Sequence, residues 1–190
     1  MEATGFDAWV LTLAVFLPLV GALIMMAVPK AYELEVKLIG LGSSLAALAV
    51  GVYILFQFDY GSSSELQFVV DKGWIDIINS RYIIGLDGLS LPLLLLSLLV
   101  VPLCLVYSWN HVPSPGNTKA FFILLLILST GMNGSFISQD MILFFVFFEI
   151  VLLPMYFLIG VWGGEERRYA SLKFFLYTLF GSALMIISFL

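Results

Sequence analysis

Residues 141–160 of this sequence read Met-Ile-Leu-Phe-Phe-Val-Phe-Phe-Glu-Ile-Val-Leu-Leu-Pro-Met-Tyr-Phe-Leu-Ile-Gly. About twenty apolar residues in an α-helix are enough to cross a hydrocarbon core of about 30 Å. One ionisable side chain, Glu149, interrupts the stretch, with eight or more uncharged residues on either side. The stretch therefore predicts a membrane-spanning helix that contains a carboxyl group.

The composition of the whole chain favours the same class of protein. Hydrophobic residues make up 62% of the 190 residues and charged residues 11%, which is too apolar for a soluble domain of this size. Further apolar windows bring the number of predicted helices to six, near residues 8–28, 38–58, 89–109, 120–138, 141–162 and 170–190. We therefore predict an all-α polytopic membrane protein, with residues 1–190 as a single transmembrane domain in a lipid bilayer and no nucleic-acid partner.

The longest connection, residues 59–88, has the composition of a short β-hairpin. Residues 66–70 and 81–86 are rich in branched and aromatic side chains, and residues 71–76 between them supply turn chemistry. An isolated hairpin is marginally stable in water. We therefore expect it to pack either on the loops of its own helices or on the edge of a neighbouring subunit.

The basic residues predict how the chain is oriented in the membrane. Counted loop by loop, six of them fall at one set of helix ends and two at the other: Lys30, Lys37, Lys119, Arg167, Arg168 and Lys173 against Lys72 and Arg81. Because cytoplasmic loops carry the excess of Lys and Arg, the amino terminus and the hairpin are predicted to lie outside. Acidic residues contribute little to this rule, and those on the external side are interpreted as solvated surface: Asp59, Glu65, Asp71, Asp76, Asp87 and Asp140.

Glu149 is the leading candidate for a functional residue. An acidic side chain at the centre of a spanning helix costs about 2.5–3.5 kcal/mol, so its presence favours a functional role. Glu149 is eight residues, about 12 Å, from Met141 and thirteen residues, about 20 Å, from Trp162, which places it near the middle of the bilayer. Pro154 leaves the Ile150 carbonyl without its helical donor and favours a kink beside the carboxyl group. The alternative is a carboxyl group hydrogen-bonded to a neighbouring helix for stability alone.

Other polar and small side chains allow two interpretations each. Lys173 lies about one turn inside the last apolar window, where it either extends to the headgroups or takes part in proton uptake. Ser129, Thr130 and Asn133 either bond within the bundle or line a polar path beside Glu149. Glycine and serine at close spacing in residues 131–138 favour tight helix packing.

Four segments together resemble a known family. They are Gln139–Tyr156, Trp162–Ala170, Lys173–Thr178 and, upstream, Gly85–Pro92. Their sequence is similar to that of subunit M of bacterial NADH-quinone oxidoreductase, the antiporter-like subunit of respiratory complex I. The resemblance extends over essentially the whole chain, and it identifies the chain as the amino-terminal portion of such a subunit.

The resemblance implies a function as well as a fold. In that family a glutamate on the fifth helix, which Glu149 matches, pairs with a lysine on the seventh helix and relays protons; Lys173, on the sixth helix, is not that lysine. The chain would then be a subunit of a proton-translocating enzyme in the bacterial inner (cytoplasmic) membrane, beside other membrane-arm subunits including antiporter-like neighbours. No cofactor is expected in this chain, since the flavin, iron–sulfur clusters and quinone would belong to partner subunits.

Three alternatives remain open at the level of sequence. A multisubunit cation/proton antiporter of the Mrp type and the membrane subunits of energy-converting hydrogenases share the same ancestral helices and a comparable glutamate. A membrane fragment with a purely structural role is the third alternative. It predicts that Glu149→Gln leaves transport unchanged.

Overall fold

The computed structural model describes residues 5–78, 80–113 and 116–189. Its elements in chain order are α1 (Asp7–Ala27), α2 (Glu33–Gln57), a 3₁₀ turn (Tyr60–Ser62), β1 (Gln67–Ile75), a second 3₁₀ turn (Asp76–Ile78), β2 (Ser80–Leu86), α3 (Ser90–Tyr107), α4 (Thr118–Ile137), α5 (Met141–Trp162) and α6 (Arg167–Phe189). Within these residues, six helices are long and apolar enough to cross a membrane. The predicted polytopic fold with a hairpin between the second and third helices is confirmed.

The helices extend beyond the apolar windows where polar side chains stabilise their ends. The second helix begins at Glu33 rather than near residue 38, and Glu33 forms an ion pair of 2.9 Å with Lys37 one turn later. The last helix begins at Arg167, whose guanidinium Nη1 donates to the Val161 carbonyl at 2.9 Å. Hydropathy alone therefore underestimates the length of both helices.

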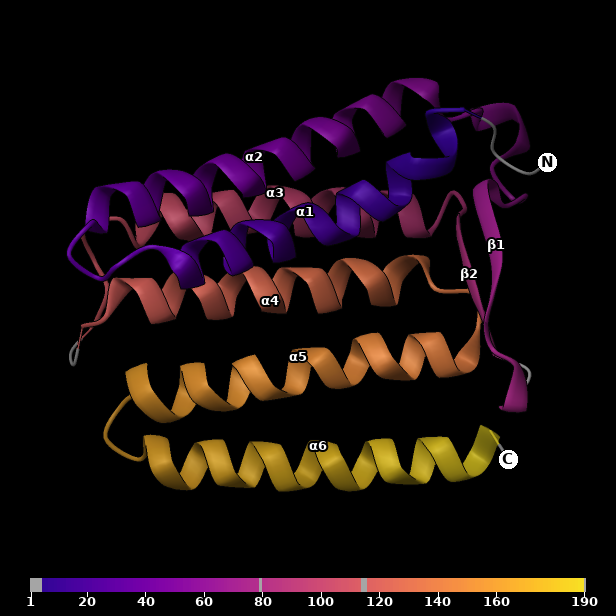
Figure 1. Ribbon diagram of the computed structural model, residues 1–190. Helices are drawn as coiled ribbons and strands as arrows, with labels where there is room; N and C mark the ends of the chain where they lie inside the picture. Colours follow the sequence, from indigo (N-terminus) through magenta and orange to yellow (C-terminus); the bar gives the residue numbers. More distant parts are fainter. Residues whose placement is uncertain (1–4, 79, 114–115, 190) are drawn as a thin grey trace.

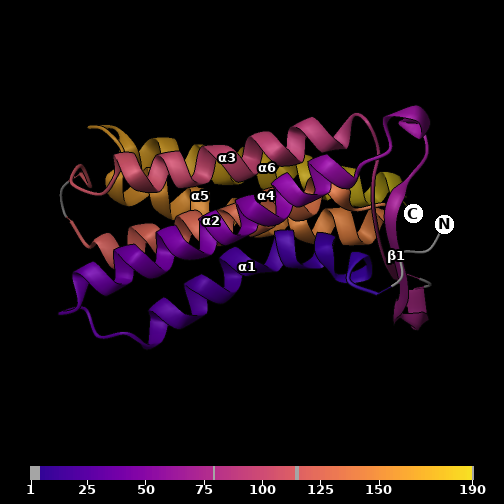
Figure 2. The same cartoon turned by 90° about the horizontal axis from the view of Figure 1, so that it is seen from above.

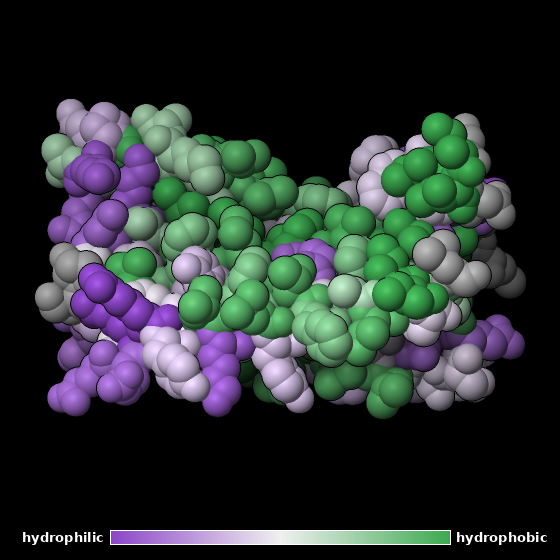
Figure 3. Space-filling view, turned by 90° about the horizontal axis from the view of Figure 1, so that it is seen from below, coloured by the Kyte–Doolittle hydropathy of each residue, from purple (hydrophilic) through white to green (hydrophobic). Residues whose placement is uncertain are grey.

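The helix α4 lies at the centre of the bundle and contacts α1, α2, α3 and α5. Its side chains Phe122, Leu126 and Ile137 are fully buried. The helix α6 packs on α5 at the edge of the bundle (Figures 1 and 2). Of the α6 residues that the structure describes, Ser171 and Ser182 are buried. The face of α6 turned away from α5 is therefore open. In Figure 3, which views the molecule from the side of α6, hydrophobic side chains cover much of the middle of the molecule, and hydrophilic ones gather at one end.

The two strands pair antiparallel, but the first is longer than the sequence predicted. Asp71 lies opposite Ile83, and Ile75 lies opposite Ser80, so most of residues 71–76 belongs to the strand. The prediction of a turn there was wrong, because Asp71 is stabilised in the sheet by an ion pair with Arg81, with Oδ1 and Nε 2.7 Å apart. The chain instead reverses between Ile75 and Ser80, the interval that contains the 3₁₀ turn Asp76–Ile78.

The hairpin packs on the molecule's own loops and helices. The backbone N–H of Gln139 donates to the Ile83 carbonyl at 2.9 Å, and Ser138 forms a β-bridge with Ile84. The hydroxyl groups of Tyr82 and Thr12 of α1 are 3.2 Å apart. The first of the two expected partner surfaces is therefore present, and the outer edge of β2 is partly occupied by the α4–α5 connection.

The two ends of the bundle differ in charge, as the loop count predicted. Lys72 and Arg81 belong to the hairpin, whereas the other six basic residues lie in or beside the connections at the opposite end. In Figure 3 hydrophilic side chains gather at the end away from the hairpin. The orientation of the bundle in a membrane remains a prediction from this difference.

Candidate functional site

Glu149 lies within an uninterrupted α5, nine residues into the helix. The residue is partly buried, and its carboxyl oxygen Oε1 is fully buried. Among the described residues, this oxygen has no hydrogen-bond partner. Burying a polar atom without a hydrogen bond is unfavourable by about 1–3 kcal/mol in proteins. A structural hydrogen-bonding role therefore accounts poorly for this carboxyl group.

The helix period shows which neighbour Glu149 faces. The rings of Tyr156 on α5 and Phe175 on α6 have centroids 5.3 Å apart, and a Cβ atom at Gly160 would lie 3.1 Å from Oγ of Ser171. Glu149 precedes Tyr156 by seven residues, about two helical turns, and so lies on the same side of α5. It therefore faces α6.

The register between these antiparallel helices also places Glu149 along α6. Tyr156 lies opposite Phe175, so Glu149, seven residues earlier, lies level with Ser182. Ser182 is 3% exposed, and its hydroxyl donates to the Leu179 carbonyl at 3.1 Å. The carboxyl group thus lies at a polar point of the α5–α6 contact, in the half of the bundle nearer the hairpin.

Lys173 is not brought close to Glu149. It lies nine residues before Ser182 on α6, and hence about 14 Å from the level of Glu149 along the helix axis. The side chain is exposed, with Nζ 5.5 Å from the ring centre of Tyr169. Such a contact between a cation and an aromatic face is weakly favourable at an exposed site. The position fits a lysine that extends toward the headgroups.

Pro154 and the small residues of α4 determine how α5 packs. Pro154 is buried inside α5 and has no N–H to donate to the Ile150 carbonyl. On α4, a Cβ atom added to Gly134 would overlap the ring of Phe147 of α5. Gly134 therefore permits the close approach of α4 and α5, and the predicted packing role of these small residues is confirmed.

The polar residues of α4 form their hydrogen bonds within the bundle. Asn133 is fully buried; its Oδ1 accepts from the Ser97 hydroxyl of α3 at 2.7 Å, and its Nδ2 lies 3.4 Å from both the Ala14 carbonyl of α1 and Oγ of Ser129. The Ala14 carbonyl needs this donor, because Pro18, four residues later, lacks an N–H. These contacts favour bonding within the bundle over a polar path beside Glu149.

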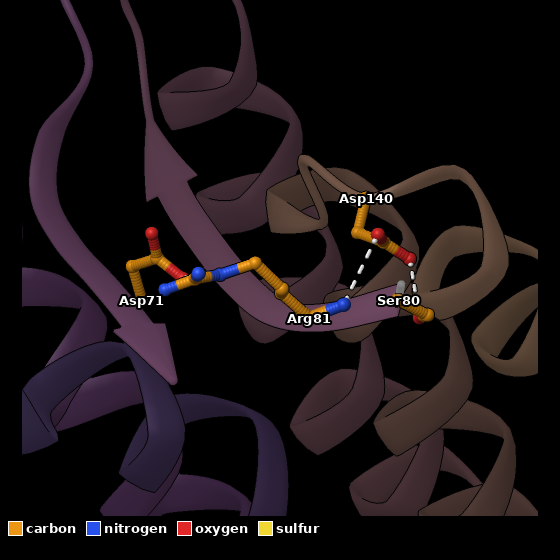
Figure 4. A network of polar contacts seen from close by, with 4 residues as sticks. All are labelled: Asp71, Ser80, Arg81 and Asp140. Carbon is orange, nitrogen blue, oxygen red and sulfur yellow. Dashed lines mark hydrogen bonds and ion pairs between the residues drawn. The ribbon is translucent and has the colours of Figure 1, made fainter. Parts of the chain in front are cut away.

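Asp140, immediately before α5, is a residue whose role the sequence interpretation missed. Its Oδ1 accepts from the Leu143 N–H at 2.9 Å. The same Oδ1 accepts from the Ser80 hydroxyl at 2.9 Å, and Oδ2 accepts from the Arg81 N–H at 3.3 Å (Figure 4). Asp140 is thus the N-cap of α5 and also a link to β2. An aspartate directly before a long apolar run is a typical N-cap signal, which would have identified the first of these roles.

The same contacts affect the ionisation of Asp140. Burial disfavours its charged form, but the hydrogen bonds from Leu143, Ser80 and the Arg81 backbone together hold the pKa of the carboxyl below its ordinary value. Hydrogen bonds from N–H and O–H donors stabilise a carboxylate in this way. Asp140 therefore accepts hydrogen bonds from α5 and the hairpin as a carboxylate at neutral pH.

The fold and the carboxyl group of α5 define a multi-pass α-helical membrane protein with an ionisable group inside one span. Residues 12–133, more than half of the chain, match the family described as NADH-ubiquinone oxidoreductase chain 4, amino terminus. Residues 138–190 match the family described as NADH:quinone oxidoreductase/Mrp antiporter, TM. The chain belongs to the NADH-ubiquinone oxidoreductase chain 4 family, and the resemblance drawn from its sequence is confirmed.

Curated relatives show the same family. NADH-ubiquinone oxidoreductase chain 4 of Arabidopsis thaliana is 37% identical over 174 residues, which cover 91% of this chain and 34% of that protein. NADH-quinone oxidoreductase subunit M of Rhodobacter capsulatus is 36% identical over 182 residues, which cover 94% of this chain and 34% of that protein. This chain therefore spans about a third of the length of these relatives.

Solved structures share the arrangement of helices. A chain of respiratory complex I from Thermus thermophilus with bound NADH matches with a TM-score of 0.72 and 27% identity, covering 90% of this chain and 33% of that one. A chain of the membrane-bound sulfane sulfur reductase, an archaeal respiratory membrane complex, matches with a TM-score of 0.75 and 19% identity, covering 94% and 36%. The second match, at 19% identity, shows a shared fold alone.

Proposed function

We propose that this chain forms part of a membrane-arm subunit of a proton-translocating NADH:quinone oxidoreductase. Its family membership and the six potential spans support a place in the membrane of such a complex. The distribution of basic residues supports an orientation with the hairpin and the amino terminus outside the bacterial inner membrane. Other membrane-arm subunits, including antiporter-like neighbours, would be its partners.

Glu149 would act as a proton-relay carboxyl. The observation that carries this proposal is the buried Oε1 atom, which lies in the α5–α6 contact without a hydrogen-bond partner in the described chain. A carboxylate there is costly, and a cation within about 4–6 Å would stabilise its charged form. The proton on Glu149 would therefore be bound or released as nearby charges change.

The redox chemistry would take place in partner subunits that hold the flavin, the iron–sulfur clusters and the quinone. This chain would contribute charge movement driven by that chemistry, as a subunit of a translocase. Moving one charge across 100 mV requires about 2.3 kcal/mol. Such a route has to be gated by coupled charges, a task suited to a carboxyl group inside a span.

Replacing Glu149 with Gln tests the proposal, because the amide has nearly the same shape and cannot carry the proton. In the assembled complex, Glu149→Gln should abolish or sharply reduce NADH-driven proton pumping into membrane vesicles, and Glu149→Asp should restore part of it. Glu165→Gln, an exposed residue of the α5–α6 connection, is the control and should pump normally. Normal pumping by assembled Glu149→Gln complex would show that the carboxyl group is dispensable.

A cation/proton antiporter of the Mrp type is the second candidate function. It is favoured by one specific observation, because the family matched by residues 138–190, which include Glu149, covers both classes of protein. Isolation in mild detergent followed by mass spectrometry distinguishes them. NADH-oxidising and iron–sulfur subunits that copurify would support the oxidoreductase, whereas small Mrp-type membrane subunits without redox partners would support the antiporter.

A further inference from the structure

We propose that Asp140 is a positioning residue, which couples the hairpin to α5 and thereby holds Glu149 in place against α6. The proposal rests on the role proposed above for Glu149. It assigns a function to a residue at the surface end of the helix, nine positions, or about 14 Å, from the carboxyl group that it would position.

The carboxylate of Asp140 is engaged on two sides at once. It accepts from the Leu143 N–H, which fixes the first turn of α5, and from Ser80 and Arg81 of β2. Figure 4 shows the side chain between the strand and the helix. Hydrogen bonds to a charged group are stronger than those between neutral groups. Asp140 therefore caps α5 and also attaches the start of this helix to β2.

The strand that holds Asp140 is itself firmly placed. Ser80 is 2% exposed, Arg81 is paired with Asp71 of β1, and Tyr82 contacts Thr12 of α1. The strand β2 thus connects β1, α1 and the α4–α5 connection at one end of the bundle. A displacement of β2 would pass directly to the first turn of α5.

The helix α5 has a point of weakness between Glu149 and its far end. Because Pro154 cannot donate to the Ile150 carbonyl, one backbone hydrogen bond is missing at that turn. The far end is anchored separately, where Nε1 of Trp162 donates to the Gly116 carbonyl at 2.8 Å. Glu149 therefore lies on the segment of α5 between Asp140 and the missing bond. The position of this segment depends on Asp140 and on the packing of Phe147 against Gly134.

Asp87 offers a matched control at the same end of the bundle. Its Oδ1 accepts from the Ser90 N–H at 2.7 Å and from the Leu89 N–H at 3.1 Å, at the start of α3. Hydrogen bonds from Ser90, together with a backbone contact from Leu89, lower the pKa of Asp87 as well. In the described part of the chain, however, Asp87 makes no hydrogen bond to β2 or α5. Asp87 is the same type of residue as Asp140 and also accepts hydrogen bonds from the first turn of a helix. It differs because it lacks the link to β2 that the experiment tests.

The experiment uses the full complex in its native membranes, with Asp140→Ala, Asp140→Asn and Asp87→Ala. Asn caps a helix about as well as Asp. When its carbonyl oxygen takes the place of Oδ1, the NH2 group that replaces Oδ2 can only donate and cannot accept from the Arg81 N–H. Proton transport is measured at equal amounts of assembled complex. The carboxyl C=O band of Glu149 is followed in the redox-induced infrared difference spectrum, where Glu149→Gln identifies it by removing it.

We expect Asp140→Ala to shift the Glu149 band and to lower proton transport by up to about 100-fold, the loss that a misplacement of about 1 Å can cause. Asp140→Asn should have a smaller effect in the same direction, and Asp87→Ala should leave the band and the transport unchanged. A band and a transport rate that stay the same in assembled Asp140→Ala would overturn the proposal. If that variant does not assemble, Ser80→Ala removes a single link, and the same two outcomes decide.

The two proposals can fail separately. If Glu149→Gln stops transport while Asp140→Ala leaves the band and the transport intact, the positioning role of Asp140 is wrong and the relay role of Glu149 stands. If Glu149→Gln removes no band and leaves transport intact, the relay role is wrong, and the positioning role is overturned with it.

Discussion

At the scale of single residues, this molecule contains two kinds of buried polar group. Asn133 has its amide group fully engaged by three helices, whereas Oε1 of Glu149 has no partner in the described chain. The sequence alone placed both inside spans but could not show whether Asn133 bonds within the bundle, because the direction of a side chain depends on which helices are neighbours. The cost of the carboxyl group identified Glu149. Nothing in the local sequence shows that Asn133 would donate to the Ala14 carbonyl, which Pro18 leaves without its helical donor.

The contact between Asn133 and Pro18 predicts a double-mutant cycle. Asn133→Leu should destabilise the protein by about 0.6–1.7 kcal/mol, the range for polar contacts between membrane helices. In a Pro18→Ala background the loss should be smaller, because Ala at position 18 supplies an N–H to the Ala14 carbonyl. Thermal unfolding of the four purified variants checks this, and equal losses in both backgrounds would refute the link.

The low pKa of Asp140 predicts how stability depends on pH. Because the folded-state pKa is depressed, the stabilisation is fully present above the unfolded value of about 3.9 and is lost as pH falls through the folded pKa. The unfolding temperature of the native protein should exceed that of Asp140→Asn by a constant amount from pH 7 to about pH 5, and the difference should shrink in stronger acid. A difference that grows on acidification would contradict this account.

At the scale of elements, the apolar windows and the hairpin composition predicted most of the fold. Predicted and observed bounds agree for α5, since Asp140 and Gly163 mark its ends. They differ for α2 and α6, where ion pairs and side-chain hydrogen bonds continue the helix past the apolar window. The hairpin turn was misplaced because Asp71, favourable in turns, is held in β1 by Arg81. That contact depends on strand pairing and is not visible locally.

The α4–α5 contact predicts a cost for any side chain at Gly134. Gly134→Ala should destabilise the protein by about 1–3 kcal/mol, because the new methyl group would overlap the Phe147 ring. The matched control is Gly42→Ala in α2, where an added Cβ has no neighbour within 4 Å. Thermal unfolding of the two variants should show a loss for the first and little change for the second. A similar result for both would contradict the close approach of α4 and α5.

At the scale of the whole molecule, the hairpin marks one end of the bundle and six of the eight basic residues mark the other. The charge count predicts that the hairpin end faces outward. A membrane-impermeant thiol reagent should therefore label Ser64→Cys in intact cells, and Glu165→Cys only after the membrane is permeabilised. Both positions are exposed. Labelling of Glu165→Cys in intact cells, with Ser64→Cys protected, would reverse the orientation.

A proton-relay role for Glu149 is tested by counting the protons moved per NADH oxidised by assembled complex in sealed vesicles. In Glu149→Gln this ratio should fall well below that of the native complex, because the route through this subunit would be closed. An unchanged ratio in fully assembled Glu149→Gln complex would contradict the claim and leave Glu149 with a structural role.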